Sequence, residues 1–190
     1  MSNTDPRILR TRKAILETAR SMLLDEEPGQ LTLRRIADEA GYSRQAVHTN
    51  FGNLNGILTA VALEGLGIDS DPDCLTEQLG DPTPLGVEEL RGRVLSLVTR
   101  IDSERVLLGR IAHAPDLPSL SEALLQATRR IFDLRRPTIG LGDLDELASS
   151  FLLGGFANVL RDWVRGELEA TPEAITDIIT GRIAEVGELA

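Results

Sequence analysis

Residues 31–51 read LTLRRIADEAGYSRQAVHTNF, and this stretch decides the fold of the N-terminal part of the chain. It holds two short segments with apolar residues at helical spacing, one on each side of Gly41. Thr32 and Ser43 precede these segments and suit an N-cap, because a hydroxyl can accept a hydrogen bond from an unpaired backbone N–H. Gly41 can adopt the positive φ that ends a helix. The stretch therefore predicts a helix-turn-helix.

The second of these two helices carries a polar face. Arg44 and His48 are four residues apart, and so are Gln45 and Thr49, which places all four side chains on one surface. In a DNA major groove, Arg can hydrogen-bond guanine and Gln can pair with adenine. On spacing alone, an ordinary helical hairpin with a solvated polar face remains the alternative.

Helical spacing of apolar residues continues through the rest of the chain, and no segment alternates as a half-buried strand does. Pro6 predicts the start of a first helix that ends near Asp25, and Asn53 predicts a fourth helix that runs to about Leu66. A connector rich in Pro, Gly and Asp follows. Further helices are predicted at about 86–101, 103–113, 119–135, 143–168 and 172–188.

These segments predict an all-α fold with two domains. We expect a three-helix, helix-turn-helix DNA-binding domain over residues 1–50 and a connecting helix over 51–66. A larger helical domain for dimerisation and ligand binding is expected over 67–190.

Composition excludes several classes of protein. The chain has 190 residues and a net charge of −10, but the first 60 residues hold eight basic and seven acidic side chains and are nearly neutral. Cys74 is the only cysteine and there are only two histidines, so neither a disulfide framework nor a metal cluster is expected. No apolar run is long enough for a membrane span, and residues 1–13 lack the apolar core of a secretory signal. We expect a cytoplasmic protein with no cofactor. It is not expected to be an enzyme, because no phosphate-binding loop or nucleophile motif is present.

A longer pattern runs from Arg12 to about Val61 and is made of Ile15, Ala19, Leu23, Leu31-Thr32, Ile36-Ala37, Ala40-Gly41, Ser43, Ala46-Val47, Phe51 and Leu58. This pattern resembles the DNA-binding domain of the TetR family of bacterial transcriptional regulators. The resemblance implies an all-α homodimer that binds a palindromic DNA operator, most often as a repressor released by a small-molecule effector.

Two positions depart from the family. His48 stands where the family usually has Tyr, and Leu54 stands where it usually has Lys; both family residues commonly meet the DNA backbone. An alternative is therefore a sensor or interaction module with weakened or lost DNA binding. The candidate DNA-binding residues are Thr32, Arg34, Ser43, Arg44, Gln45, His48, Thr49, Asn50, Arg12 and Lys13. A basic N-terminal arm would consist of Arg7, Arg10, Arg12 and Lys13, and a solvated helix face is the alternative for these four.

In the C-terminal half, residues 147–164 are apolar on nearly every side, which indicates a helix buried on more than one side. The resemblance places this segment in a dimer interface with the last helix; an intrachain core helix is the alternative. The interface candidates are Phe151, Leu152, Gly155, Phe156, Val159, Leu160 and Trp163. An effector pocket would be lined by Leu107, Leu108, Ile111, Phe132, Phe151 and Asn158, although such residues are more often simply core.

Overall fold

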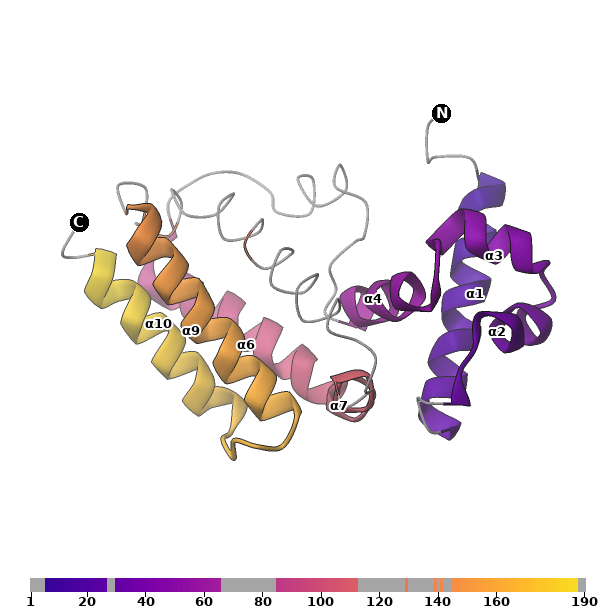
Figure 1. The fold of residues 1–190 in the computed structure, drawn as a ribbon. Coiled ribbons are helices and arrows are strands. Elements are labelled where there is room, and N and C mark those ends of the chain that lie inside the picture. The colour runs from indigo at the N-terminus through magenta and orange to yellow at the C-terminus, as the bar shows by residue number, and fades with distance from the viewer. Residues whose placement is uncertain are drawn as a thin grey trace.

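The computed structural model describes residues 6–26, 30–65, 85–112, 129, 139, 141 and 145–187. The regular elements of this described part are all helical, as predicted (Figure 1). They are α1 (Pro6–Asp25), α2 (Leu33–Ala40), α3 (Arg44–Phe51), α4 (Leu54–Gly65), α6 (Val87–Ser103), α7 (Arg105–Ala112), α9 (Glu146–Val164) and α10 (Pro172–Gly187). None of these helices is long and apolar enough to cross a membrane.

Helices α2 and α3 form the predicted helix-turn-helix, and side chains close both N-termini. Thr32 Oγ1 accepts a hydrogen bond from Arg35 N (3.2 Å), and Ser43 Oγ accepts one from Ala46 N (3.1 Å). Gly41 ends α2 with φ of 73°, a conformation that residues with a Cβ rarely adopt. The predicted ends of these two helices are thus confirmed to within one residue.

The N-terminal helices α1 to α4 share a small apolar core. Ile15 and Leu23 of α1, Ile36 of α2, Val47 of α3 and Ile57 of α4 are all fully buried. Burial of each such side chain contributes about 1.5–3 kcal/mol. This packing fixes α3 against α1 and leaves its opposite face to solvent.

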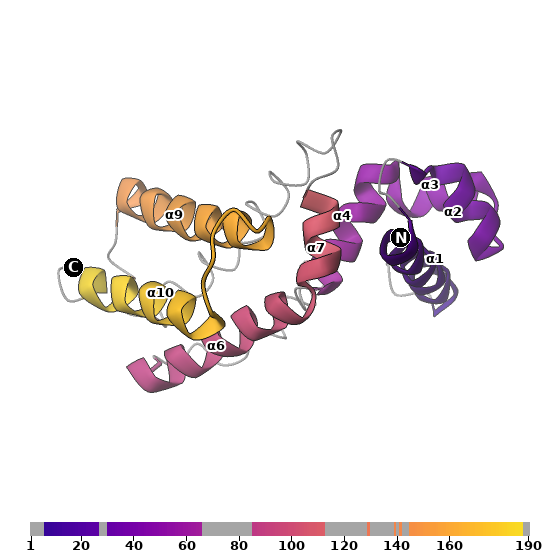
Figure 2. The ribbon, with the colours of Figure 1, turned by 90° about the horizontal axis from the view of Figure 1, so that it is seen from below.

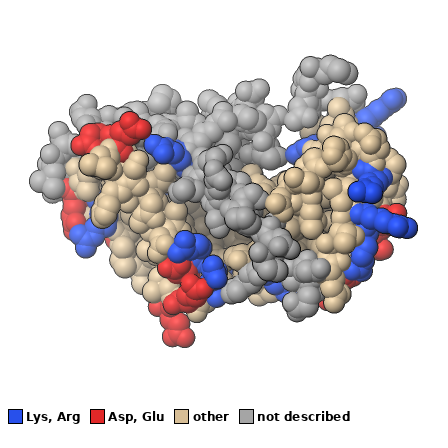
Figure 3. All heavy atoms as spheres, viewed as in Figure 1, with Lys and Arg blue, Asp and Glu red and all other residues tan. Residues whose placement is uncertain are grey.

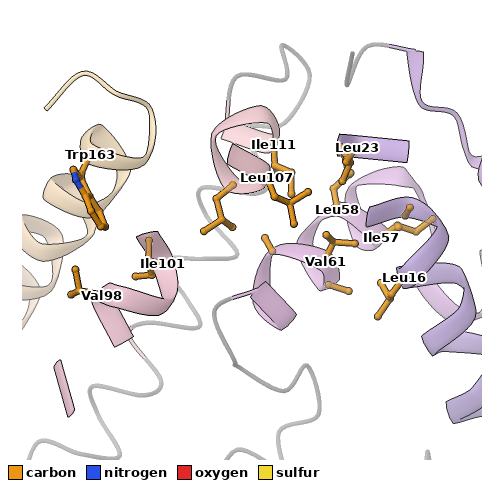
Figure 4. Packing of buried hydrophobic residues seen from close by; sticks show 14 of the residues in the cluster. Leu16, Leu23, Ile57, Leu58, Val61, Val98, Ile101, Leu107, Ile111 and Trp163 are labelled. Atoms are coloured by element: carbon orange, nitrogen blue, oxygen red, sulfur yellow. The ribbon is translucent and has the colours of Figure 1, made fainter. Parts of the chain in front are cut away.

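The C-terminal helices form a second group in which α6, α9 and α10 lie side by side (Figures 1 and 2). Helix α10 packs along α6 with Ile175, Ile179 and Ile183 buried. The pair is joined at its surface by Arg91, whose Nη2 lies 2.7 Å from Asp177 Oδ1. Trp163 of α9 is fully buried close to Val98 and Ile101 of α6 (Figure 4).

Helix α7 connects the two groups. Its buried side chain Ile111 lies beside Leu23 of α1 and Leu58 of α4 (Figure 4), and Leu107 is buried one turn earlier in the helix. On that side, Arg110 Nη1 donates to the carbonyl oxygens of Leu23 (3.2 Å) and Glu26 (3.0 Å), at the end of α1.

On its other side, α7 contacts α9. Arg105 Nε donates to the carbonyl oxygen of Trp163 (3.1 Å), and its guanidinium lies 5.0 Å from the centre of a Trp163 ring. A Cβ added to Gly109 would lie 3.2 Å from the carbonyl oxygen of Val164, so the two helices approach closely there. One short helix therefore holds α1 and α9 at a fixed separation.

The predicted C-terminal helices are found with shifted ends. The segment expected over 143–168 is the shorter α9, capped by Asp145 Oδ1 at Ala148 N (2.7 Å) and followed by Gly166 with φ of 74°. The connector over 67–84 lies outside the described residues. So does the helix expected over 119–135, apart from residue 129.

Candidate nucleic-acid interface

The outer face of α3 presents the four side chains that the sequence placed together. Arg44, Gln45, His48 and Thr49 are all exposed, while Val47 on the opposite face is fully buried. The side chains of Arg44, Gln45 and His48 form no hydrogen bond or ion pair with any described residue. Three unpartnered polar groups on an eight-residue helix are available to an external ligand.

Two further candidates on α3 donate hydrogen bonds to backbone carbonyl groups of the same helix. Thr49 Oγ1 donates to the carbonyl oxygen of Gln45 (2.8 Å), and Asn50 Nδ2 donates to that of Ala46 (2.8 Å). Thr49 still exposes its methyl group and oxygen lone pairs, but Asn50 is half-buried and lies off the exposed face. The Asn50 side chain therefore hydrogen-bonds to the backbone of its own helix.

The remaining candidates surround α3. Thr32 and Ser43 act as caps, and both remain exposed. Arg34 lies 3.7 Å from Asp38, and Lys13 lies 3.8 Å from Glu17, in ion pairs that are largely exposed on both sides. Such pairs contribute little, so either cation can turn toward another anion.

Arg12 is placed differently from the other candidates. It is half-buried, and its Nη1 donates to the carbonyl oxygen of Asn50 (2.6 Å). Its guanidinium carbon lies 4.5 Å from the centre of the Phe51 ring. The structure thus gives Arg12 partners at the end of α3, whereas the neighbouring Lys13 is exposed.

Arg35 is a nearby cation that the sequence did not single out. Its Nη1 and Nη2 donate to the two carboxylate oxygens of Glu26 (2.6 and 2.8 Å), and Nη1 also donates to the carbonyl oxygen of Gln30 (3.1 Å). The hydrogen bond that Arg35 donates to the Glu26 carboxylate raises the pKa of the Arg35 guanidinium. Arg35 therefore joins α2 to the end of α1.

Charge is unevenly distributed between the two groups of helices. Figure 3 shows Lys and Arg along the outer edge of the α1–α3 end, with Asp and Glu prominent at the end formed by α6, α9 and α10. A surface of this kind favours approach of a polyanion through the α1–α3 end.

The interface candidates on α9 divide into exposed and buried residues. Phe151 is 80% exposed and Gly155 is exposed, while Phe156, Val159 and Leu160 are half-buried. Leu152 and Trp163 are buried within the chain, and Trp163 Nε1 donates to the carbonyl oxygen of Ala170 (2.9 Å). These two side chains have almost no surface to offer a partner, because they already fill the intrachain core.

A second exposed apolar stripe, missed in the sequence, lies on α10. It consists of Ala174, Ile178 and Gly181, and Ile178 is 57% exposed. Leu147, one turn before Phe151 on α9, is 81% exposed and was missed as well. Apolar residues occur on several faces of both helices, so periodicity alone could not identify the outer one.

The proposed pocket residues do not come together. Leu107, Leu108 and Ile111 are buried side chains of α7, whereas Phe151 and Asn158 lie on the exposed side of α9. The Asn158 side chain is hydrogen-bonded there to the side chains of Asp162 and Arg161. Phe132 lies outside the described residues, which also contain no cluster of three or more His, Cys, Asp or Glu side chains suited to a metal ion.

Comparison with known proteins adds two findings. Residues 15–61 match the family model described as "Bacterial regulatory proteins, tetR family". The search of curated proteins found no match to this chain.

Several solved structures share the fold over nearly the full length. The dihydroxyacetone kinase operon activator DhaS is 13% identical, with a TM-score of 0.62, and the match covers 95% of this chain and 98% of that one. The TetR family repressor AlkX from a Dietzia species is 16% identical, with a TM-score of 0.58 and coverage of 100% and 99%. NalD, the secondary repressor of a Pseudomonas aeruginosa multidrug efflux pump, is 21% identical, with a TM-score of 0.50 and coverage of 95% and 97%.

Proposed function

We propose that the chain is a DNA-binding transcriptional regulator of the TetR family, which acts as a homodimeric repressor and binds a palindromic operator. The observation that carries this proposal is the outer face of α3, where Arg44, Gln45 and His48 are exposed and unpartnered among the described residues. This face belongs to the segment that matches the family model.

In the proposed complex, α3 lies in the major groove. Arg44 reads guanine and Gln45 reads adenine, because these side chains can form two hydrogen bonds with the edges of those bases. His48 and Thr49 contact the adjoining base or phosphate. Thr32, Ser43, Arg34 and Lys13 surround α3 and meet the phosphate backbone, which positions the helix without reading sequence.

The proposed dimer is formed by α9 and α10. Phe151 and Ile178 are large apolar side chains that the chain itself leaves exposed. Gly154, Gly155 and Gly181 lie in helix interiors, and a Cβ added to any of them would meet nothing within 4 Å. Each lies three or four residues from Phe151 or Ile178 on the same helix, so it would let a second copy approach the backbone closely beside that exposed side chain.

Release by a small-molecule effector is the third part of the proposal. Regulators of this family often respond to an effector that binds in the C-terminal domain, and we expect the same site here. The protein is proposed to act in the cytoplasm. Repression is favoured over activation because AlkX and NalD are both described as repressors, although DhaS is described as an operon activator.

Selection from a library of random-sequence DNA duplexes tests the proposal directly. The purified protein should enrich a palindromic site, and sedimentation should show two protomers on each duplex. Arg44→Ala should reduce the enrichment, whereas Arg93→Ala, which removes the same charge from an exposed position on α6, should not. A folded protein that enriches no duplex would instead support the alternative of a sensor or interaction module without DNA binding.

A further inference from the structure

The end of α3 depends on contacts from outside the helix. The last four carbonyl groups of any α-helix lack partners within it. Here the carbonyl oxygen of His48 accepts from Gly52 N (2.7 Å), and that of Phe51 accepts from Asn53 N (2.8 Å). The carbonyl oxygen of Asn50 accepts from Arg12 Nη1 (2.6 Å), a charged donor that reaches it from α1 across 38 residues of sequence.

Arg12 also contacts the last side chain of α3. Its guanidinium lies 4.5 Å from the centre of the half-buried Phe51 ring, within the range of a cation–π interaction. A cation at a helix C-terminus is further favoured by the helix dipole. One side chain of α1 thus satisfies a backbone acceptor and covers an aromatic ring at the same helix end.

The same helix end also lies close to α4. A Cβ added to Gly56 would lie 2.0 Å from the carbonyl oxygen of Phe51, which leaves room only for glycine at that position. Helix α3 has eight residues, too few to be stable by itself. Its direction relative to α1 and α4 therefore depends on the buried side chain of Val47 and on the contacts at the helix ends.

We infer that Arg12 is a positioning residue, which sets the direction in which Arg44, Gln45 and His48 project, and that it is not itself a phosphate contact. This inference rests on the proposed DNA-binding function. If the Arg12 side chain turned toward a phosphate, it would lose its hydrogen bond to the Asn50 carbonyl oxygen and uncover the Phe51 ring. Arg12 therefore contributes to sequence discrimination although it touches no base.

Lysine substitution separates the two roles, because a phosphate contact needs only a charge whereas the observed contacts need a planar guanidinium. The variants are Arg12→Lys and Arg12→Gln. The comparison variant is Lys13→Gln, which removes the neighbouring exposed cation that is proposed to meet phosphate and should therefore lose affinity for both duplexes. The probes are the duplex that the parent enriches from a random library and a scrambled duplex of equal length and composition. Affinity is measured for both duplexes over a series of salt concentrations.

If Arg12 positions α3, both Arg12 variants should lose about ten-fold in affinity for the selected duplex. Their affinity for the scrambled duplex, and the slope of log affinity against log salt, should stay near those of the parent. If Arg12 contacts phosphate, Arg12→Lys should bind like the parent. Arg12→Gln should then lose affinity for both duplexes and about 0.9 units of slope for each protomer. That second pattern would overturn the inference.

A measurement without DNA keeps the inference separate from the proposed function. Amide hydrogen exchange over 47–52 should be faster in both Arg12 variants than in the parent, while amides of α6 and α10 exchange as before. Unchanged exchange over 47–52 would overturn the inference even if the parent binds DNA well. A parent that enriches no duplex would overturn the proposed function, and the role of Arg12 in discrimination with it.

Discussion

Arg20 of α1 and Glu104, the residue between α6 and α7, form a hydrogen-bonded ion pair in which Arg20 Nη2 lies 2.6 and 2.5 Å from the two carboxylate oxygens. Both side chains are mostly shielded from solvent. Beside this pair, Arg100 Nε donates to the carbonyl oxygen of Gly65 (3.3 Å), at the end of α4. The junction of α6 and α7 therefore holds both α1 and α4 through polar contacts.

Glu104→Gln should lower the free energy of unfolding by about 1–3 kcal/mol, because it leaves the partly buried Arg20 without its charged partner. Chemical denaturation measures this loss. The matched control is Glu89→Gln, which removes a carboxylate from the exposed ion pair with Arg93 and should cost less than about 0.5 kcal/mol. Equal effects of the two substitutions would contradict the importance given to the Arg20–Glu104 pair.

Arg44→Ala and Gln45→Ala should each weaken binding to the selected duplex by about 1–3 kcal/mol if each side chain reads a base edge. Because both side chains are exposed and form no hydrogen bond or ion pair with described residues, circular dichroism and the melting temperature should not change. Affinities equal to that of the parent for both variants would show that another face of the protein meets DNA.

Phe151→Glu should convert the dimer to monomers at micromolar concentration, because a charge would enter the proposed interface. Phe151 is 80% exposed in the single chain, so the substitution removes little from the intrachain core. Sedimentation velocity measures the change. Val106→Glu is the control, since Val106 on α7 is 69% exposed and outside the proposed interface. A parent that sediments as a monomer would contradict the dimer itself.

Gly181→Ala should have opposite effects on the folding of the chain and on its association. Alanine favours a helix over glycine by about 1 kcal/mol, and the added Cβ meets nothing within the chain. In a dimer, the same methyl group would separate the facing helices and raise the dissociation constant. Gly92→Ala on α6 is the control: its Cβ also meets open space, so it should stabilise the chain and leave association unchanged.

Leu54→Lys restores the cation that the family usually has at this position. Leu54 is half-buried against the core, so the melting temperature should fall by a few degrees, while the long stem of lysine retains part of the packing. In the dimer the slope of log affinity against log salt should steepen by roughly 1.8, with little change in sequence preference. An unchanged slope in a folded variant would show that position 54 does not face the DNA backbone.

The sequence predicted the helix-turn-helix closely because its determinants are local. Thr32, Gly41 and Ser43 each act within three or four residues, through a cap or a positive φ. Arg12 shows the limit of that reasoning: its partner is 38 residues away, so only the packing of α1 on α3 shows that it is not part of a free basic arm.

The outer face of α9 was harder to predict for a related reason. Phe156, Val159, Leu160 and Trp163 form a regular apolar stripe, but that stripe is half-buried or buried within the chain. Leu147 and Phe151 occupy another side of the same helix. When a helix is apolar on most sides, its sequence does not show which side is buried within its own chain and which side stays exposed.

Helix α7 carries a consequence for the length of the DNA target. It holds α1 through Arg110 and α9 through Arg105, so the two reading helices of a dimer would be spaced by a rigid connection and not by a tether. Half-sites read by a symmetric dimer repeat at about one turn of DNA, or 10–10.5 base pairs. Five extra base pairs at the centre would turn one half-site to the opposite side of the duplex, out of reach of its protomer. The protein would thus measure the distance between half-sites as well as read their bases.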